Sequence, residues 1–137
     1  MSRFVLDASV TLCWFFEDQA TVYTDSVLDR IAGGGEALTS TIWPLEVANA
    51  LAVAERRRLI KSAQSTAFVE ALGQLPIQVE RSGAQRAFKE VLEISRHHRL
   101  SAYDASYLDL AMREALPLAT VDGPLRTAAR AAGVKLA

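Results

Sequence analysis

Apolar positions along the chain fall into short continuous runs and into longer segments in which they recur every three or four residues. Short runs predict buried strands, and the longer periodic segments predict helices with one apolar face. The predicted strands are residues 3–7, 36–40, 76–80, 116–122 and 134–137. The predicted helices are residues 10–16 with Ser9 as the N-cap, 20–32, 44–59, 61–75, 82–98 with Phe88 on the apolar face, 103–115 and 123–133.

Glycine and proline mark several of these boundaries. The glycines at 33–35 favour termination of the helix before them, and Pro44 and Pro124 are tolerated in the first turn of a helix. Because strands alternate with helices, we predict an α/β fold: a three-layer α/β/α arrangement around a central, mostly parallel sheet. No linker, repeat or low-complexity tract interrupts the pattern, so residues 1–137 are expected to form a single domain.

Two acidic residues stand where predicted strands end. Asp7 closes the first strand, and Asp122 follows the apolar run that ends near Thr120. Open parallel sheets bind ligands in crevices outside the carboxyl ends of their strands. Asp7 and Asp122 are therefore expected to be neighbours at a ligand-binding edge of the sheet.

A third acid, Glu46, interrupts an otherwise apolar face of a predicted helix. At 100° per residue, Glu46 shares one side of helix 44–59 with Asn49, Ala50 and Val53. An unpaired charge on a packed face costs several kcal/mol. The arginines at 56–58 lie about three helical turns away, too far along the axis to pair with it. A bound cation is the simplest compensation.

A fourth acid, Asp104, is placed in the same way on helix 103–115. It shares a side with apolar or aromatic residues, namely Tyr107, Leu108, Ala111 and Ala115. By contrast, Asp109 and Arg113 form an i, i+4 pair on the opposite side. An exposed ion pair of about 0.3 to 0.5 kcal/mol explains that pair. We therefore exclude Asp109 from the predicted site.

Each of the four acids also has a purely structural explanation. All four lie at or near the start of a helix, where capping and the helix dipole favour a carboxylate. Capping is the simpler explanation for any one of them alone. Capping does not explain why Glu46 and Asp104 lie on apolar stripes, so the four together favour a cation site.

Composition and charge restrict the picture further. The chain has 15 Lys and Arg residues against 16 Asp and Glu residues, so affinity for a polyanion must come from local patches. One cysteine, Cys13, cannot form an internal disulfide, which suits a reducing compartment, and we expect a cytoplasmic protein. The apolar segment 4–16 contains Asp7 and is too short to span a bilayer, so no membrane association is expected.

The donor types predict the class of metal. Carboxylates and water are hard oxygen ligands suited to Mg²⁺ or Mn²⁺, and the spacing of cysteine and histidine is not that of a zinc site. The adjacent His97 and His98 are expected at the surface, at the end of a helix. The segment 33–36, GGGE, lacks the lysine and hydroxyl residue of a phosphate-binding loop, so nucleotide binding is not predicted.

Four stretches taken together resemble one family. They are VLDASV at 5–10, PLEVANAL at 44–51, LSAYDASYLDLA at 100–111 and ATVDGPLRTAARAAGVKL at 119–136. In order and spacing the chain resembles a PIN-domain ribonuclease, of the VapC type found in type II toxin–antitoxin modules. The resemblance covers nearly the whole chain. It implies a PIN-like α/β/α domain that hydrolyses RNA phosphodiester bonds with Mg²⁺ or Mn²⁺, forms a homodimer and is silenced by a VapB-like antitoxin.

Carried over by motif, the resemblance assigns a role to each acid. Asp7, Glu46, Asp104 and Asp122 match the four acids of the family site, with Asp7 and Asp104 as principal metal ligands and the other two completing the site directly or through water. Ser9, Asn49 and Thr120 match the polar residues that accompany the acids. Ser101 stands where many relatives carry threonine, a departure that touches no ligand.

An acidic pocket repels RNA, so basic residues must hold the flanking phosphates. Arg126 and Arg130 are the preferred candidates because their helix begins just after Asp122. Other candidates lie in 56–61 and 96–99, and each set can equally be a solvated helix face. An aspartate-nucleophile phosphatase would require Asp at position 9. A non-catalytic module that only binds RNA or protein in the same cleft remains the alternative.

Overall fold

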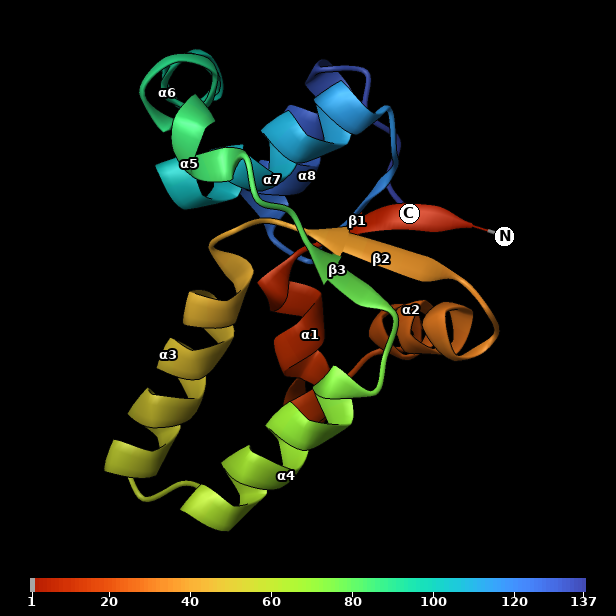
Figure 1. The fold of residues 1–137 in the computed structure, drawn as a ribbon, viewed down its shortest axis with the longest axis vertical. Helices are drawn as coiled ribbons and strands as arrows, with labels where there is room; N and C mark the ends of the chain where they lie inside the picture. The colour runs from red at the N-terminus through yellow and green to blue at the C-terminus, as the bar shows by residue number, and fades with distance from the viewer. Residues whose placement is uncertain (1) are drawn as a thin grey trace.

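A computed structural model describes residues 2–137, and its centre is a sheet of four parallel strands. The strands are β1 (Arg3–Leu6), β2 (Glu36–Thr39), β3 (Ile77–Val79) and β4 (Leu118–Ala119), in the order β3-β2-β1-β4. Helices cover both faces (Figure 1). The predicted three-layer α/β arrangement is confirmed.

The helices divide into two groups, one on each face of the sheet (Figure 1). One face carries α1 (Ala8–Phe15), the short 3₁₀ helix η1 (Glu17–Gln19), α2 (Val22–Ala32), α3 (Trp43–Arg56) and α4 (Ser62–Gly73). The other carries α5 (Gly83–Arg86), the π-helical segment η2 (Ala87–Val91), α6 (Leu92–His98), α7 (Ala102–Glu114) and α8 (Gly123–Ala131). Among the described residues, no helix is both long and apolar enough to cross a membrane.

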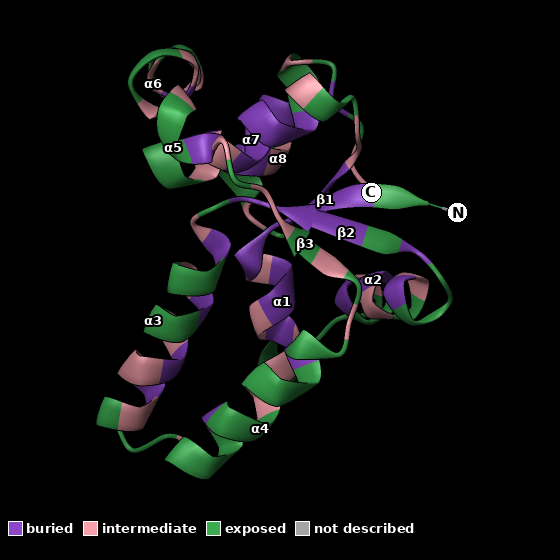
Figure 2. Cartoon of the chain, viewed as in Figure 1, coloured by how far each residue is buried: buried purple, intermediate pink, exposed green. Residues whose placement is uncertain are grey.

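The core lies between the sheet and these two helical layers. Phe4, Val5 and Leu6 of the inner strand β1 are fully buried, as expected for a parallel strand that is covered on both faces. Figure 2 shows that α7 is also largely buried, whereas α4 is mostly exposed. Helix α7 packs against β1, β4, α6, η2 and α8, so little of its circumference reaches water.

Three elements differ from the prediction. Helix α1 begins at Ala8 with Asp7 at the N-cap position, so Ser9 lies in the first turn and is not the cap. The predicted strand 134–137 is reduced to an isolated bridge between Leu136 and Leu118, because only one residue pair adopts the parallel ladder. The helix at 82–98 is confirmed in extent, but the π-helical η2 interrupts it.

The π-helical segment also changes the exposed face. Phe88, predicted to face the core, is 93 % exposed. A π-turn contains one more residue than an α-turn, so the residues that follow shift around the helix axis relative to an α-helical pattern. The prediction from α-helical periodicity therefore assigned Phe88 to the wrong face of the helix.

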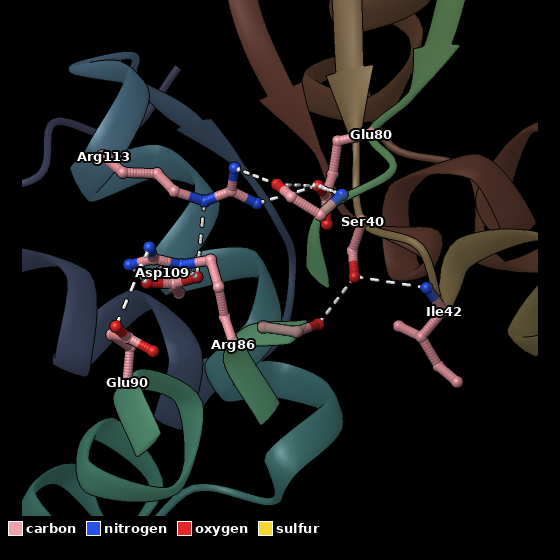
Figure 3. A network of polar contacts seen from close by, with 9 residues as sticks. Ser40, Ile42, Glu80, Arg86, Glu90, Asp109 and Arg113 are labelled. Atoms are coloured by element: carbon pink, nitrogen blue, oxygen red, sulfur yellow. Dashed lines mark hydrogen bonds and ion pairs between the residues drawn. The ribbon is translucent and has the colours of Figure 1, made fainter. Parts of the chain in front are cut away.

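The predicted i, i+4 ion pair of Asp109 and Arg113 is confirmed, but its predicted exposure is wrong, because Asp109 is 3 % exposed and lies in a buried ionic network (Figure 3). Arg86 Nε and Nη2 donate to the two carboxylate oxygens of Asp109 at 2.7 and 2.8 Å. Arg113 Nε lies 3.4 Å from Asp109 Oδ2, and Arg113 Nη2 lies 2.9 Å from Glu80 Oε2. Asp109 lies on a part of α7 that neighbouring elements cover, so its carboxylate is not exposed to solvent.

Removing the central acid should strongly destabilise the protein. Asp109→Ala leaves Arg86 and Arg113 without their shared carboxylate, and breaking a buried ion pair in this way costs about 3 to 5 kcal/mol. Glu90→Gln is the matched control, because Glu90 approaches Arg86 only to 4.0 Å at a partly exposed position. Its expected cost is at most about 1 kcal/mol. Urea unfolding measures both, and equal losses would contradict the assignment.

Candidate active site

The carboxyl edge of the sheet gathers polar residues from several elements. Asp7 follows β1, Ser40 follows β2, Glu80 follows β3 and Thr120 follows β4. Because all four strands are parallel, these positions lie along the same edge. The predicted placement of Asp7 and Asp122 at this edge is consistent with that topology.

Asp7 is a buried carboxylate held by two hydroxyl groups. Ser9 Oγ and Thr120 Oγ1 each donate to Asp7 Oδ2 at 2.6 Å. Burial raises the pKa of Asp7 above its ordinary value of 3.8, and the nearby charge of Asp122 raises it further, against hydrogen bonds from Ser9 and Thr120 that lower it. Both side-chain donors reach the same oxygen, and a backbone hydrogen bond with Ser9 also lowers the pKa of this carboxyl group.

Glu46 lies in the first turn of α3 and is half-buried. The buried face of that helix is formed by Trp43, Val47 and Leu51, and Glu46 lies beside it. The hydroxyl of Tyr107 in α7 donates to Glu46 Oε1 at 2.6 Å. Burial and the charges of Asp7 and Asp104 raise the pKa of Glu46, and the hydrogen bond from Tyr107 only partly opposes them.

Asp104 occupies the first turn of α7 without capping it. Ser101 is the N-cap, and its hydroxyl accepts a hydrogen bond from the Asp104 backbone N–H at 3.1 Å. Burial, followed by the charges of Asp122 and Asp7, raises the pKa of Asp104 to about 6. Since the hydroxyl already performs the cap, the Asp104 carboxylate is not needed for capping.

Asp122 does have a capping role. Its Oδ2 accepts the Leu125 backbone N–H at 2.9 Å at the N-cap of α8. Its own backbone N–H donates to Thr120 Oγ1 at 3.0 Å, which places it beside the hydroxyl that binds Asp7. The structural explanation therefore holds for Asp122, although its charge also acts on Asp7 and Asp104.

The four acids form one electrostatic group. Asp7 interacts with each of the other three, and Asp104 interacts with Glu46 and Asp122. Within residues 2–137, none of the four forms an ion pair with lysine or arginine. Like charges at short range raise one another's pKa when no cation is near. The cluster is thus an uncompensated concentration of carboxylate.

The chemistry of these donors fits a hard divalent cation. Carboxylate oxygens are the ligands that Mg²⁺ and Mn²⁺ prefer, and a cation would relieve the repulsion among them. In the described part of the chain, no three His, Cys, Asp or Glu side chains already stand close enough to hold a metal ion.

The predicted supporting residues differ in their placement. Ser9 and Thr120 contact Asp7 directly, and their oxygens lie 3.2 Å apart. Asn49 is exposed, and its side chain has no hydrogen bond to any of the four acids in the region covered by the structure. A supporting role for Asn49 therefore stays a prediction from helical spacing.

The two predicted RNA-contacting arginines also differ. Arg126 Nη1 donates to the Thr120 carbonyl oxygen at 2.8 Å, and its guanidinium lies 5.5 Å from the centre of the Tyr23 ring. Arg130 is exposed on the following turn of α8. Arg126 is thus held against the protein, whereas Arg130 is accessible from solvent.

Sequence reasoning missed the contribution of Tyr107. Its position on the same side of α7 as Asp104 was predicted, but no role was assigned to its hydroxyl. The available signal was a phenol on an apolar helical face, three residues from a predicted ligand. A buried hydroxyl needs a hydrogen-bond partner, and the acid on α3 was a candidate.

Comparison with known proteins identifies the family. The PIN domain family matches residues 4–131, so the chain belongs to the PIN-domain family. A search of curated proteins finds no match.

Solved structures share the fold at low sequence identity. The VapBC2 structure from Rickettsia felis, bound to a promoter DNA fragment, has a TM-score of 0.70 and 12 % identity, covering 98 % of this chain and 97 % of that chain. FitAcB from Neisseria gonorrhoeae has a TM-score of 0.63 and 19 % identity, covering 97 % and 95 %. PAE2754 from Pyrobaculum aerophilum has a TM-score of 0.63 and 18 % identity, covering 93 % and 84 %.

The raised pKa of Asp104 predicts a pH-dependent stability difference. The folded protein binds this proton more tightly than the unfolded chain, so the contribution of Asp104 becomes unfavourable as pH rises from about 4 through about 6. In the presence of a chelator, Asp104→Asn should therefore have a higher melting temperature than wild type near pH 7, and the difference should be smaller near pH 4. Thermal unfolding across this range measures the difference. A constant difference would argue against the shifted pKa.

Proposed function

We propose that this chain is a metal-dependent endoribonuclease, the toxin of a VapBC-type toxin–antitoxin module. The observation that carries the proposal is the cluster of Asp7, Glu46, Asp104 and Asp122 in a PIN domain, four carboxylates that form no ion pair with a lysine or arginine of residues 2–137. PIN domains are generally metal-dependent nucleases. The fold shared with VapBC2 and FitAcB supports the toxin assignment.

The four acids are the proposed metal ligands. Asp7 and Asp104 are the principal ligands for Mg²⁺ or Mn²⁺, and Glu46 and Asp122 complete the site directly or through water. When bound, such an ion lowers the pKa of water to supply a nucleophile and neutralises charge on the scissile phosphate. The side chains in this mechanism bind and orient, and no covalent nucleophile from the protein is required.

Hydroxyl groups keep the principal ligand in place. Ser9 and Thr120 both donate to Oδ2 of Asp7 and so hold the carboxylate in one orientation. Each hydroxyl is also an acceptor, Ser9 for the Val121 N–H at 3.2 Å and Thr120 for the Asp122 N–H at 3.0 Å. The loop after β4 is thereby fastened to the same carboxylate, which keeps Asp122 beside the site.

RNA requires basic groups around this acidic centre. We assign phosphate contact to Arg130, with Arg126 holding the Thr120 carbonyl and contributing positive charge beside it. Further candidates are the exposed basic residues at the end of α3 and in the connection to α4, namely Arg56, Arg57, Arg58 and Lys61. We also propose a VapB-like antitoxin partner, a homodimer of single-domain chains and a cytoplasmic location.

A non-catalytic RNA- or protein-binding module is the alternative. It would use the same cleft, but its binding would not lead to strand cleavage. The two functions are separated by incubating RNA with the purified protein and Mg²⁺ or Mn²⁺, with a chelator as control. Binding without new 5′ ends would favour the alternative.

Asp7→Asn and Asp104→Asn should each reduce cleavage by more than about 100-fold, because even residues that only orient metal ligands typically contribute 10- to 100-fold. Initial rates on a defined RNA measure the loss, and circular dichroism confirms folding. Asp18→Asn, at an exposed position in η1, is the matched control and should retain wild-type activity. Undiminished cutting by both site variants would refute the assignment of the acids.

Arg130→Gln should weaken RNA binding in a salt-dependent way. Loss of one phosphate contact reduces the slope of log affinity against log salt by about 0.7 for single-stranded RNA. The measurement uses the Asp104→Asn background to prevent cleavage. Lys135→Gln is the control, because Lys135 is exposed and adjoins the start of β4, at the edge opposite the acids. The same slope change in both variants would show a general charge effect only.

A further inference from the structure

Tyr107 connects the two helices that carry acids of the site. Its side chain is fully buried in α7, and its hydroxyl donates to Glu46 Oε1 in α3 at 2.6 Å. The two residues are 61 positions apart in the chain, so the contact depends on the packing of the fold. Asp104 lies one helical turn before Tyr107 on the same side of α7.

The hydroxyl and the carboxylate depend on each other. A buried phenol without an acceptor loses its hydrogen bond to water and gains nothing in return. Glu46 supplies that acceptor, and its flexible side chain is held by the bond. The bond uses Oε1 of Glu46, so Oε2 is the oxygen that is left to other ligands.

We propose that Tyr107 is a positioning residue of the acidic site, whose hydroxyl holds Oε1 of Glu46 so that Oε2 is the oxygen offered to the divalent ion. The inference rests on the proposed function for the identity of the ligand. Asp104 and Tyr107 then act together from α7, one as a ligand and the other by orienting the ligand on α3. Glu46 binds through a single oxygen, and not through both.

The chain provides a matched control tyrosine. The hydroxyl of Tyr23 is also buried, but it has no hydrogen-bond partner within residues 2–137. Tyr23→Phe therefore removes the same atom without breaking a side-chain contact, whereas Tyr107→Phe removes the bond to Glu46. A difference between the two variants reports on the contacts of the Tyr107 hydroxyl, with Glu46 and the Ala8 backbone, and not on the loss of a phenol.

Metal affinity tests the role directly. Mn²⁺ binding is measured by electron paramagnetic resonance on purified protein without RNA. Tyr107→Phe should weaken Mn²⁺ binding about 10-fold, as is typical for a residue that orients a metal ligand, and Tyr23→Phe should leave it unchanged. Equal affinity of Tyr107→Phe and wild type would overturn the proposal.

A double substitution tests whether Tyr107 acts through Glu46. Glu46→Gln keeps an oxygen that accepts the hydroxyl but removes the charge offered to the metal. In the Glu46→Gln background, Tyr107→Phe should then reduce Mn²⁺ affinity much less than it does in the wild-type background. Losses that multiply would show that Tyr107 acts independently of Glu46, and the proposal would fail.

Crystal structures separate this inference from the proposed function. In metal-free crystals, Glu46 should keep one orientation in wild type and change it in Tyr107→Phe. An unchanged Glu46 would overturn the positioning role even if wild type bound no Mn²⁺. A wild-type protein that binds no Mn²⁺ would contradict the proposed function alone. Crystals of the wild-type protein with Mn²⁺ give a test that does not depend on the folding of a variant. In them, a Glu46 that binds Mn²⁺ through Oε1 or through both oxygens would also overturn the inference.

Discussion

Asp7, Glu46, Asp104 and Asp122 bring together negative charge with which no lysine or arginine in residues 2–137 forms an ion pair. Asp7 is the centre of this arrangement because it is buried and its charge acts on each of the other three acids. Burial of like charges is unfavourable, so the surrounding structure must hold them in place. Strand β1 does so through the fully buried Phe4, Val5 and Leu6, which precede Asp7 directly. The folding free energy of the core thus maintains an arrangement of carboxylates that is unfavourable when all of them are charged.

The protein stabilises its acids in two different ways. Asp109 receives a bidentate contact from Arg86 and lies near Arg113, so its charge is compensated. Within residues 2–137, Asp7 and Glu46 form no ion pair and their side-chain hydrogen bonds come from hydroxyl groups. A hydroxyl orients a carboxylate without cancelling its charge, whereas an arginine does both. The difference is what leaves one group of acids able to attract a metal ion and makes the other part of the scaffold.

The sequence predicted the layers of the fold and the neighbourhood of the four acids, because strand ends and helical spacing depend on local periodicity. It failed where packing on several sides decided the outcome. Asp109 is buried because α7 is surrounded, and Phe88 is exposed because a π-turn shifts the helical register. Asn49 is exposed, although helical spacing gives it the same side of α3 as Glu46. Hydrogen bonds between distant segments, such as that of Tyr107, depend on tertiary packing that periodicity does not describe.

Helix α7 is held on opposite sides by contacts of different kinds. Tyr107 and Asp109 are two residues apart, about 200° around the axis, so one side is joined to α3 and the other to Arg86. Rotation of the helix would stretch both contacts at once. The orientation of Asp104 is consequently set in part by an ionic network on the reverse of the helix. Evolution could therefore tune the acidic centre through substitutions that never touch it.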